Sequence, residues 1–346
     1  MKNQTAFLVE PRKIVIRDTS MPKVGDEDIL VEIKHVGICG SDMFFFRDPT
    51  YGGLCDTKLP IVLGHECAGS VVAKGKNVTT YSVGDMVALE PGVPCGKCSY
   101  CFSGRYNLCP DMIFMSAPPF VSGALSKYVA HPACMSFKLP GDVDTIEGSL
   151  IEPLAVGMHA ARRSKAGPGK TATILGAGCI GLMTMLSCKA SGVTDIIMVD
   201  VFDNRLKKAM EMGASAVVNA ANEDAVQAVM EKTDQMGSDL IFETAGSKET
   251  ASMTPSVVAR GGSIIIVGCV HDKVDLDLLS LGSKEADILS IFRYCNMYPP
   301  AIKLVAKGIV DVKSMVSIKF DFEQVQQAFE YALDNKQKIT KAVIEL

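Results

Sequence analysis

The chain has 346 residues, 48% of them hydrophobic, and a formal net charge of -4 at pH 7. That length exceeds a typical single core, so two domains are expected. The slight acidity argues against nucleic acid as a partner, because phosphate binding needs concentrated Lys and Arg. No apolar run reaches the roughly 20 residues of a membrane span, so no membrane partner is expected either.

Twelve cysteines indicate a reducing compartment rather than a disulfide-stabilised secreted protein. Residues 1–10 lack the apolar region of a secretory signal peptide. A cytoplasmic protein is therefore expected. The cysteines without metal spacing are interpreted as buried small hydrophobic residues or incidental thiols: Cys55, Cys67, Cys134, Cys179, Cys188, Cys269 and Cys295.

The first 150 residues predict short β-strands interrupted by glycine and proline. Apolar segments at 29–33, 69–73 and 85–89 are candidate strands, and the Gly-Asp pairs at 25–26 and 84–85 predict turns. The pattern changes near residue 152, where the apolar stretch 151–161 is interpreted as a helix that joins two domains.

Four cysteines in this half have the spacing C-x2-C-x2-C-x7-C, at Cys95, Cys98, Cys101 and Cys109. Four thiolates close a tetrahedral zinc site with no position left for a substrate. An iron–sulfur cluster is the alternative, but no second set of cluster cysteines follows. The spacing therefore predicts structural zinc, and any chemistry is expected elsewhere.

A second, open metal site is expected from Cys39, His65, Glu66 and Glu152. Thiolate, imidazole and carboxylate are all zinc ligands, and three protein ligands leave a fourth position for water or substrate. The residues lie far apart in the chain, so spacing alone does not identify this set. The alternative for His65 is a loop histidine that hydrogen-bonds to backbone.

From residue 170 onward, apolar strands alternate with helical segments. Such alternation predicts a parallel, doubly wound sheet with helices on both faces. The expected strands are 171–175, 196–199, 239–242 and 263–267, with helices at 180–190 and 204–212. After residue 291 the pattern is less regular, with an amphipathic helix expected at 322–333 and a closing strand at 341–346.

The sequence G-x-G-x-x-G at residues 176–181 follows one of these strands and opens a helix, the context that a dinucleotide site requires. Gly176 suits the tight turn, Gly178 admits the pyrophosphate, and Gly181 allows close helix packing. Asp200 ends the next strand, 19 residues after Gly181, where it can accept hydrogen bonds from the ribose of NAD and repel the phosphate of NADP. The alternative for Asp200 is a helix cap, and the nearby Arg205 leaves NADP open.

These motifs together resemble the medium-chain zinc alcohol dehydrogenases over essentially the whole chain. Four motifs occur in the same order as in that family: G-I-C-G-S-D at 37–42, G-H-E at 64–66, the cysteine quartet and the glycine motif. A closer likeness to the polyol (sorbitol) dehydrogenase branch is carried by F-R-Y-C-N at 292–296, E-P-G at 90–92 and I-E-P-L at 151–154. The resemblance implies a β-rich, GroES-like catalytic domain formed by residues 1–152 and 291–346, and a Rossmann domain at 153–290.

The resemblance also implies roles for individual residues. Cys39, His65 and Glu66 would bind catalytic zinc, and Glu152 would complete the shell or bind the zinc-bound water. The implied substrate pocket includes Phe45, Phe114, Glu152, Arg293 and Tyr294. The implied cofactor contacts, besides the glycines and Asp200, are Ile180, Arg205, Val267, Gly268, Cys269, Ile291, Phe292 and Arg293.

Three of these assignments have open alternatives. Ser41 is a candidate proton relay, or else a turn hydroxyl that bonds its own backbone. Arg293 is a candidate substrate ligand, or else part of a salt bridge between domains. Phe45 stands where the polyol enzymes often carry a tyrosine, so a hydroxyl that could touch substrate is missing there and the sugar preference stays open.

The function that the resemblance implies is zinc-dependent oxidation of a polyol such as sorbitol or xylitol to the ketose, with hydride transfer to NAD and two zinc ions per chain. The alternatives are the same fold acting on L-threonine or 2,3-butanediol, or a non-catalytic zinc and nucleotide-binding protein. A homodimer or homotetramer is expected from the resemblance.

Overall fold

The computed structural model describes residues 2–50, 57–117 and 122–346, so Cys55 lies outside the described residues. The chain forms two compact units, one from residues 1–152 and 298–346 and the other from residues 153–297. Within the described residues, no helix combines the length and the apolar character that crossing a membrane would require.

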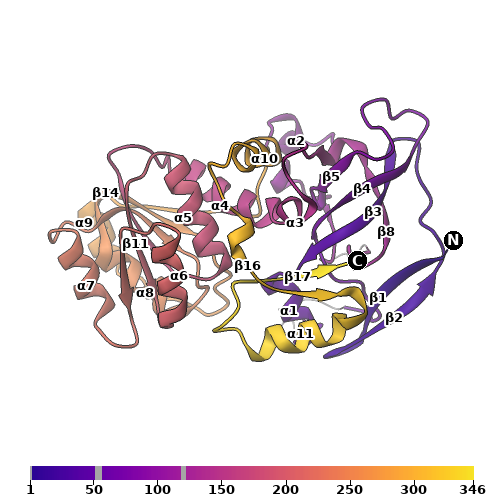
Figure 1. The fold of residues 1–346 in the computed structure, drawn as a ribbon. Helices are drawn as coiled ribbons and strands as arrows, with labels where there is room; N and C mark the ends of the chain where they lie inside the picture. The colour runs from indigo at the N-terminus through magenta and orange to yellow at the C-terminus, as the bar shows by residue number, and fades with distance from the viewer. Residues whose placement is uncertain (1, 51–56, 118–121) are drawn as a thin grey trace. The chain divides into compact units, whose positions relative to one another are not determined.

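The first unit is built on a seven-stranded sheet with the order β16-β17-β3-β4-β5-β9 and with β8 paired to β3. Its strands are β3 (Asp28–Gly37), β4 (Glu66–Lys74), β5 (Met86–Leu89), β8 (Tyr128–Pro132), β9 (Ser136–Lys138), β16 (Val316–Asp321) and β17 (Lys341–Glu345). The C-terminal strand β17 pairs with β3, so the last strand of the chain joins the sheet formed by strands from residues 28–138 (Figure 1). This pairing brings the last residues of the chain beside the metal-binding motifs.

Two smaller strand pairs and several short helices complete the first unit. The pairs are β1 (Asn3–Glu10) with β2 (Lys13–Thr19), and β6 (Gly92–Val93) with β7 (Ile113–Phe114). The α-helices are α1 (Gly40–Arg47), α2 (Ser99–Phe102), α3 (Thr145–Ser149), α10 (Tyr298–Ala306) and α11 (Val325–Asp334). The 3-10 helices are η1 (Tyr106–Leu108), η2 (Ala133–Met135), η3 (Lys313–Met315) and η4 (Phe322–Gln324).

The second unit contains a parallel six-stranded sheet with the order β12-β11-β10-β13-β14-β15. The strands are β10 (Thr171–Leu175), β11 (Asp195–Asp200), β12 (Ala216–Asn219), β13 (Ser238–Glu243), β14 (Val258–Ile266) and β15 (Asp287–Ser290). The helices after the long connecting α4 (Ile151–Arg163) are α5 (Cys179–Ala190), α6 (Asp203–Glu211), α7 (Ala225–Lys232), α8 (Lys248–Val257) and α9 (Leu278–Lys284). The expected doubly wound architecture is confirmed.

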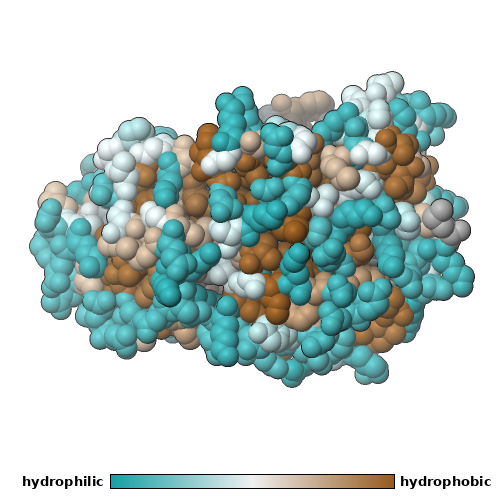
Figure 2. All heavy atoms as spheres, viewed as in Figure 1, coloured by the Kyte–Doolittle hydropathy of each residue, from teal (hydrophilic) through white to brown (hydrophobic). Residues whose placement is uncertain are grey.

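Each unit has its own apolar core. In the second unit the central strands are covered on both faces, so β10 and β11 are nearly continuous runs of buried residues, as parallel strands require. In the first unit, apolar residues of the large sheet share one core with α1 and α11, and Phe46 of α1 meets Phe329 of α11 with ring centroids 5.2 Å apart. Hydrophilic side chains cover much of the face seen in Figure 2, because these apolar residues are withdrawn into the two cores.

The structure also corrects details of the sequence-based boundaries. The amphipathic helix expected at 322–333 is a short 3-10 turn, η4, followed by α11. The family resemblance implies that residues 291–297 belong to the catalytic domain, but they group with the second unit. Local contacts explain this: Ile291 N donates to Ile266 O (3.1 Å), and Arg162 Nη2 donates to Cys295 O (2.9 Å).

Candidate metal centres and cofactor site

Cys39, His65 and Glu66 form a candidate metal centre in the first unit. Their ligand atoms all lie within 4.8 Å of one another. Cys39 follows β3 and caps the N-terminus of α1, whereas Glu66 begins β4. Because Gly37 pairs with Glu66 in the β3–β4 ladder, the ends of the two strands bring these donors together. A sulfur, a nitrogen and an oxygen donor make a set that fits zinc and leaves room for one further ligand.

Asp42 organises this centre, a role that motif spacing did not indicate. Its buried carboxylate accepts hydrogen bonds from Cys39 N (3.1 Å) and Gly64 N (3.0 Å), and one of its oxygens lies 3.5 Å from His65 Nδ1. Ser116 Oγ lies 2.8 Å from the same nitrogen. His65 Nδ1 therefore has partners in the protein, which leaves Nε2 for a metal.

Charges around His65 change its proton affinity. Burial alone would lower the pKa of His65, but the negative charges of Asp42 and Cys39 outweigh burial and hold the pKa well above its usual value. The pKa of Asp42 is lowered in spite of burial, because His65 and the two backbone N–H groups favour its ionised form. A metal ligand must be an unprotonated ring nitrogen, so metal binding at His65 would release a proton from the ring.

Lys341 is a second residue that sequence reasoning missed. Its Nζ lies 2.7 and 2.6 Å from the two carboxylate oxygens of Glu66 and also donates to Ile38 O (3.2 Å). The two side chains are only 3% and 1% exposed. An ionised carboxylate can accept about four contacts, so Glu66 can serve Lys341 and a metal together.

The other residues of this unit that were expected at the site lie in different surroundings. Glu152 lies in the first turn of α4 and is 6% exposed, but the described metal group does not include it. The ring centroid of Phe114 is 5.7 Å from that of His65. Phe45 belongs to the apolar core of the unit. Ser41 lies half-buried in the first turn of α1.

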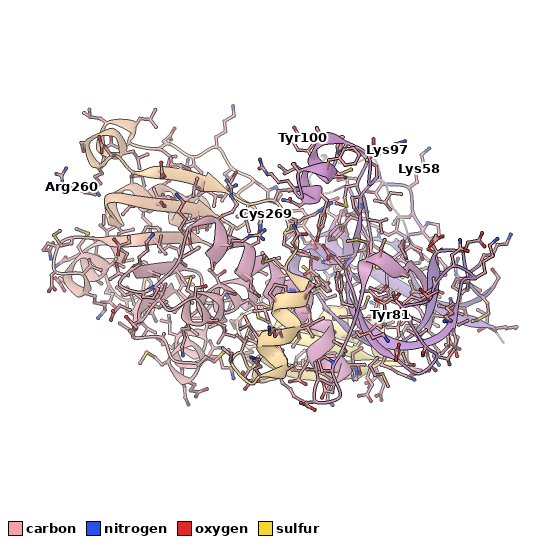
Figure 3. All side chains as sticks on the ribbon, turned by 90° about the horizontal axis from the view of Figure 1, so that it is seen from above. Lys58, Tyr81, Lys97, Tyr100, Arg260 and Cys269 are labelled. Carbon is pink, nitrogen blue, oxygen red and sulfur yellow. The ribbon has the colours of Figure 1, made fainter. Side chains whose placement is uncertain are left out.

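The four cysteines of the quartet come together as the spacing indicates, again with all sulfurs within 4.8 Å of one another. The α2 turn separates Cys98 from Cys101, whose sulfurs are 3.4 Å apart, and Cys95 N donates to Cys109 Sγ (3.3 Å). A backbone hydrogen bond from Lys97 lowers the pKa of Cys95 to about 7. In Figure 3, Lys97 and Tyr100 mark the segment that carries this group. Four sulfur donors fit a closed zinc site.

The glycine motif forms the expected loop between β10 and α5 in the second unit. Gly176 has a φ of +101°, and a Cβ on Gly181 would lie 1.8 Å from Gly176 O, so the turn and the helix approach need both glycines. Gly178 is the N-cap of α5 and Ile180 lies in its first turn. The N–H groups at the N-terminal end of a helix suit a pyrophosphate.

Asp200 is held at the end of β11 beside the glycine loop. Its side chain accepts hydrogen bonds from Ala177 N (2.7 Å), Val201 N (2.8 Å) and Phe202 N (3.0 Å). Arg205 Nη1 lies 3.6 Å from Asp200, and its guanidinium stacks 5.1 Å from the Phe202 ring centroid. The structure thus brings together the two residues that bear on the choice between NAD and NADP.

Two further segments of this unit carry expected cofactor or substrate residues. Val267, Gly268 and Cys269 follow β14, and Cys269 is exposed there (Figure 3). In the segment after β15, Arg293 has a φ of +52° and its guanidinium lies 4.8 Å from the Phe292 ring centroid, whereas Tyr294 is buried. Ile291 is half-buried in the same segment.

Comparison with known proteins decides the family. The alcohol dehydrogenase GroES-like domain matches residues 25–141, and the zinc-binding dehydrogenase domain matches residues 179–307. The uncharacterised zinc-type alcohol dehydrogenase-like protein YdjJ of Escherichia coli is 46% identical over 100% of this chain and 99% of its own length. The chain belongs to the zinc-dependent medium-chain dehydrogenases.

Two further similarities refine this placement. The sorbitol dehydrogenase of Bacillus subtilis is 39% identical over 99% of this chain and 96% of its own length, which places the chain in the sorbitol branch of the medium-chain dehydrogenases. A crystal structure of an Escherichia coli oxidoreductase of unknown specificity aligns with a TM-score of 0.97 at 46% identity, covering 100% of this chain and 99% of that one. As a medium-chain dehydrogenase the protein is an oxidoreductase that uses zinc and a nicotinamide cofactor.

Proposed function

We propose that the protein oxidises a secondary alcohol of a polyol to the ketose, with NAD as the hydride acceptor. The observation that carries the proposal is the thiolate, imidazole and carboxylate group formed by Cys39, His65 and Glu66. The similarity to sorbitol dehydrogenase supports a polyol as the substrate. The overall reaction converts the alcohol and NAD⁺ to the ketone, NADH and one proton.

Zinc bound at this group would supply the acidity that a free alcohol lacks at neutral pH, and in reverse it would polarise the ketone. The residues of the chain prepare the centre for that role. Asp42 and Ser116 orient the His65 ring, and Lys341 holds the Glu66 carboxylate in place. Held in this way, the donors need little reorganisation during the reaction.

The proton that leaves the alcohol needs an acceptor. Glu152 is proposed to receive it, since it is a carboxylate in the first turn of α4 that is only 6% exposed. Ser41 is proposed to pass it onward. Arg293 and Tyr294 are proposed to bind the remaining hydroxyls of the polyol, since several hydroxyls need several polar partners.

NAD is proposed over NADP because of Asp200. A carboxylate at the end of the second strand accepts hydrogen bonds from ribose hydroxyls and repels an additional phosphate. Arg205 reduces this repulsion, since it lies 3.6 Å from the carboxylate. Measuring turnover with both cofactors tests the assignment, and a lower KM for NADP than for NAD would overturn it.

A substrate panel tests the polyol assignment. Sorbitol, xylitol, L-threonine and 2,3-butanediol are each incubated with NAD, and NADH is followed by its absorbance. We expect turnover of at least one polyol and little or none of threonine. Strong threonine or butanediol turnover without polyol turnover would replace the proposed substrate class while leaving the reaction type intact.

Metal analysis tests the proposed count of two zinc ions per chain. Cys39→Ala and Cys101→Ala form a matched pair, because each removes one thiolate from one of the two groups. Both variants should retain about one zinc per chain, since each group is expected to hold a single ion. Only Cys39→Ala should lose turnover while it stays folded, whereas Cys101→Ala should lose stability first. Two zinc ions in Cys39→Ala would contradict the assignment.

A further inference from the structure

Glu243 is a buried acidic residue that none of the expected roles includes. It is the last residue of β13 and is 0% exposed. β13 lies next to β10, and the order of the sheet reverses between these two strands. In doubly wound sheets a dinucleotide binds at the carboxyl ends of the strands at such a reversal. Glu243 therefore lies beneath the proposed cofactor site.

The Glu243 side chain organises the turn that follows it. Its Oε1 accepts hydrogen bonds from Gly246 N (2.8 Å) and from Thr250 Oγ1 (2.8 Å). Thr250 lies in the first turn of α8, whose N-cap is Ser247. The carboxyl group thus joins residues 244–247 to the beginning of the helix.

On one side, this turn contacts the glycine loop. Thr244 N and Thr244 Oγ1 both donate to Leu175 O, at 2.9 and 2.8 Å. A Cβ on Gly176 would lie 3.0 Å from both Ala245 N and Thr244 Oγ1. The position of the turn therefore limits the path of the first glycine of the motif.

On the other side, the same turn contacts the segment after β14. Val267 N and Gly268 N both donate to the main-chain oxygen of Glu243, each at 2.9 Å. A Cβ on Gly268 would lie 2.5 Å from Gly246 N and 2.7 Å from Glu243 Oε2. The turn is thus fitted between the two segments that carry expected cofactor contacts.

The second oxygen of the carboxyl group is enclosed as well. Glu243 Oε2 is buried and has no hydrogen-bond partner among the residues that the structure describes. Burial raises the pKa of Glu243 above its ordinary value, and the hydrogen bonds from Thr250 and from backbone N–H groups oppose that shift.

We propose that Glu243 is a positioning residue of the cofactor site: its side chain holds residues 244–247 between the glycine loop and residues 267–269, and so sets the spacing that the nicotinamide cofactor needs. The inference rests on the proposed function, because it requires the cofactor to bind at this end of the sheet. Glu243 itself does not touch the cofactor, since it is fully buried.

NADH binding, measured by fluorescence titration of the full-length zinc-loaded protein, tests the proposal. Glu243→Ala should raise the Kd for NADH about tenfold or more, because Gly246 N–H and the Thr250 hydroxyl lose their acceptor. Glu243→Gln keeps an acceptor oxygen and should stay within about threefold of the wild type. KM for NAD should rise in Glu243→Ala while KM for the polyol stays nearly constant.

A threonine pair on α8 provides matched control variants in case Glu243→Ala does not fold. Thr250→Val removes one donor to the carboxyl group and should raise the Kd for NADH about threefold or more. Thr254→Val, one turn further along, removes a hydroxyl that donates to Ala251 O and should leave the Kd unchanged. Equal effects of the two valine variants would overturn the proposal.

Two further outcomes separate this inference from the proposed function. A folded Glu243→Ala variant that binds NADH as tightly as the wild type, or a Glu243→Gln variant as weak as Glu243→Ala, overturns the positioning role alone. A zinc-loaded wild type that binds neither NADH nor NADPH overturns the proposed function and this inference with it.

Discussion

Lys341 and Glu66 show how one buried pair can serve both stability and metal binding. Both side chains are almost fully enclosed, and Glu66 is also one of the three donors of the candidate metal centre. A buried carboxylate needs a compensating cation, because removal from water is costly. Lys341 supplies that cation, and it also donates to the main-chain oxygen of Ile38, the residue before Cys39.

Lys341→Met should lower the free energy of unfolding by about 3–5 kcal/mol, because it leaves the Glu66 carboxylate buried without its cation. The loss should be larger after zinc is removed with a chelator, since bound zinc also neutralises Glu66. Urea denaturation of the zinc-bound and the zinc-free protein measures this loss of unfolding free energy. Lys319→Met is the matched control, because the Lys319–Glu345 pair is half-exposed at 3.9 Å and should contribute about 1 kcal/mol or less. Equal losses in the two variants would contradict this account.

Glu90 is a buried acid with one enclosed hydrogen bond, from Tyr106 of η1 to its Oε1 (2.8 Å). Burial, assisted by the charge of Glu152, raises the pKa of Glu90 from its ordinary value of 4.5 to about 7. The folded protein therefore keeps a proton that the unfolded chain releases. The stabilisation from this proton is complete below about pH 4.5 and is lost as the pH rises through about 7.

Glu90→Gln should remove this pH dependence, because the amide does not titrate. Between pH 4.5 and 7 the wild type should lose on the order of 3 kcal/mol of stability that the variant does not lose. Urea denaturation at several pH values in this window provides the measurement. Glu231→Gln, at an exposed position, should leave the wild-type slope unchanged. A Glu90→Gln variant with the full wild-type slope would show that Glu90 is already ionised.

At the scale of elements, the β10–α5 connection depends on close packing of its own backbone. Gly181 lies in the first turn of α5 and faces Gly176 O at a distance that leaves no room for a methyl group. The approach lets the helix begin directly over the end of the strand. This contact positions the N–H groups that we propose to bind the cofactor phosphates.

Gly181→Ala should weaken NADH binding about tenfold or more, because its Cβ would push α5 away from the loop. Fluorescence titration with NADH measures the change. Gly282→Ala in α9 is the matched control, since a Cβ there would meet nothing within 4 Å. That variant should gain up to about 1 kcal/mol of stability and bind NADH normally. Unchanged binding in Gly181→Ala would exclude the loop as the pyrophosphate site.

At the scale of the whole molecule, the two kinds of site belong to different units. The Cys39, His65 and Glu66 group and the cysteine quartet lie in residues 1–152, whereas the glycine loop, Asp200 and Glu243 lie in residues 153–297. Each unit has its own apolar core. Cofactor affinity and metal binding should therefore respond to separate mutations.

Cys39→Ala should abolish polyol turnover but keep the Kd for NADH within about twofold of the wild type, because it removes a candidate metal ligand of the first unit and leaves the glycine loop of the second unit unchanged. Gly181→Ala should show the opposite result: it should lose NADH affinity and keep its zinc content. Metal analysis and NADH titration of both variants provide the test. A large loss of NADH affinity in Cys39→Ala would mean that the two sites are coupled.

The amino-acid sequence by itself determined the features that depend on a few neighbouring residues. The cysteine spacing and the glycine motif specify their loops, because each geometry is set within about fifteen residues of chain. The alternation of apolar strands and helices determined the doubly wound sheet for the same reason. The four cysteine sulfurs and the glycines of the β10–α5 loop lie where the local pattern indicates.

Only the tertiary structure decided the partners of these residues. Lys341 meets Glu66 across 275 positions, Ser116 meets His65 across 51, and Glu243 acquires its role from two segments on either side of the sheet reversal. Residues 291–297 likewise join the second unit through contacts with Ile266 and Arg162. Local periodicity does not predict such contacts, because they form only when distant strands pair and enclose the side chains between them.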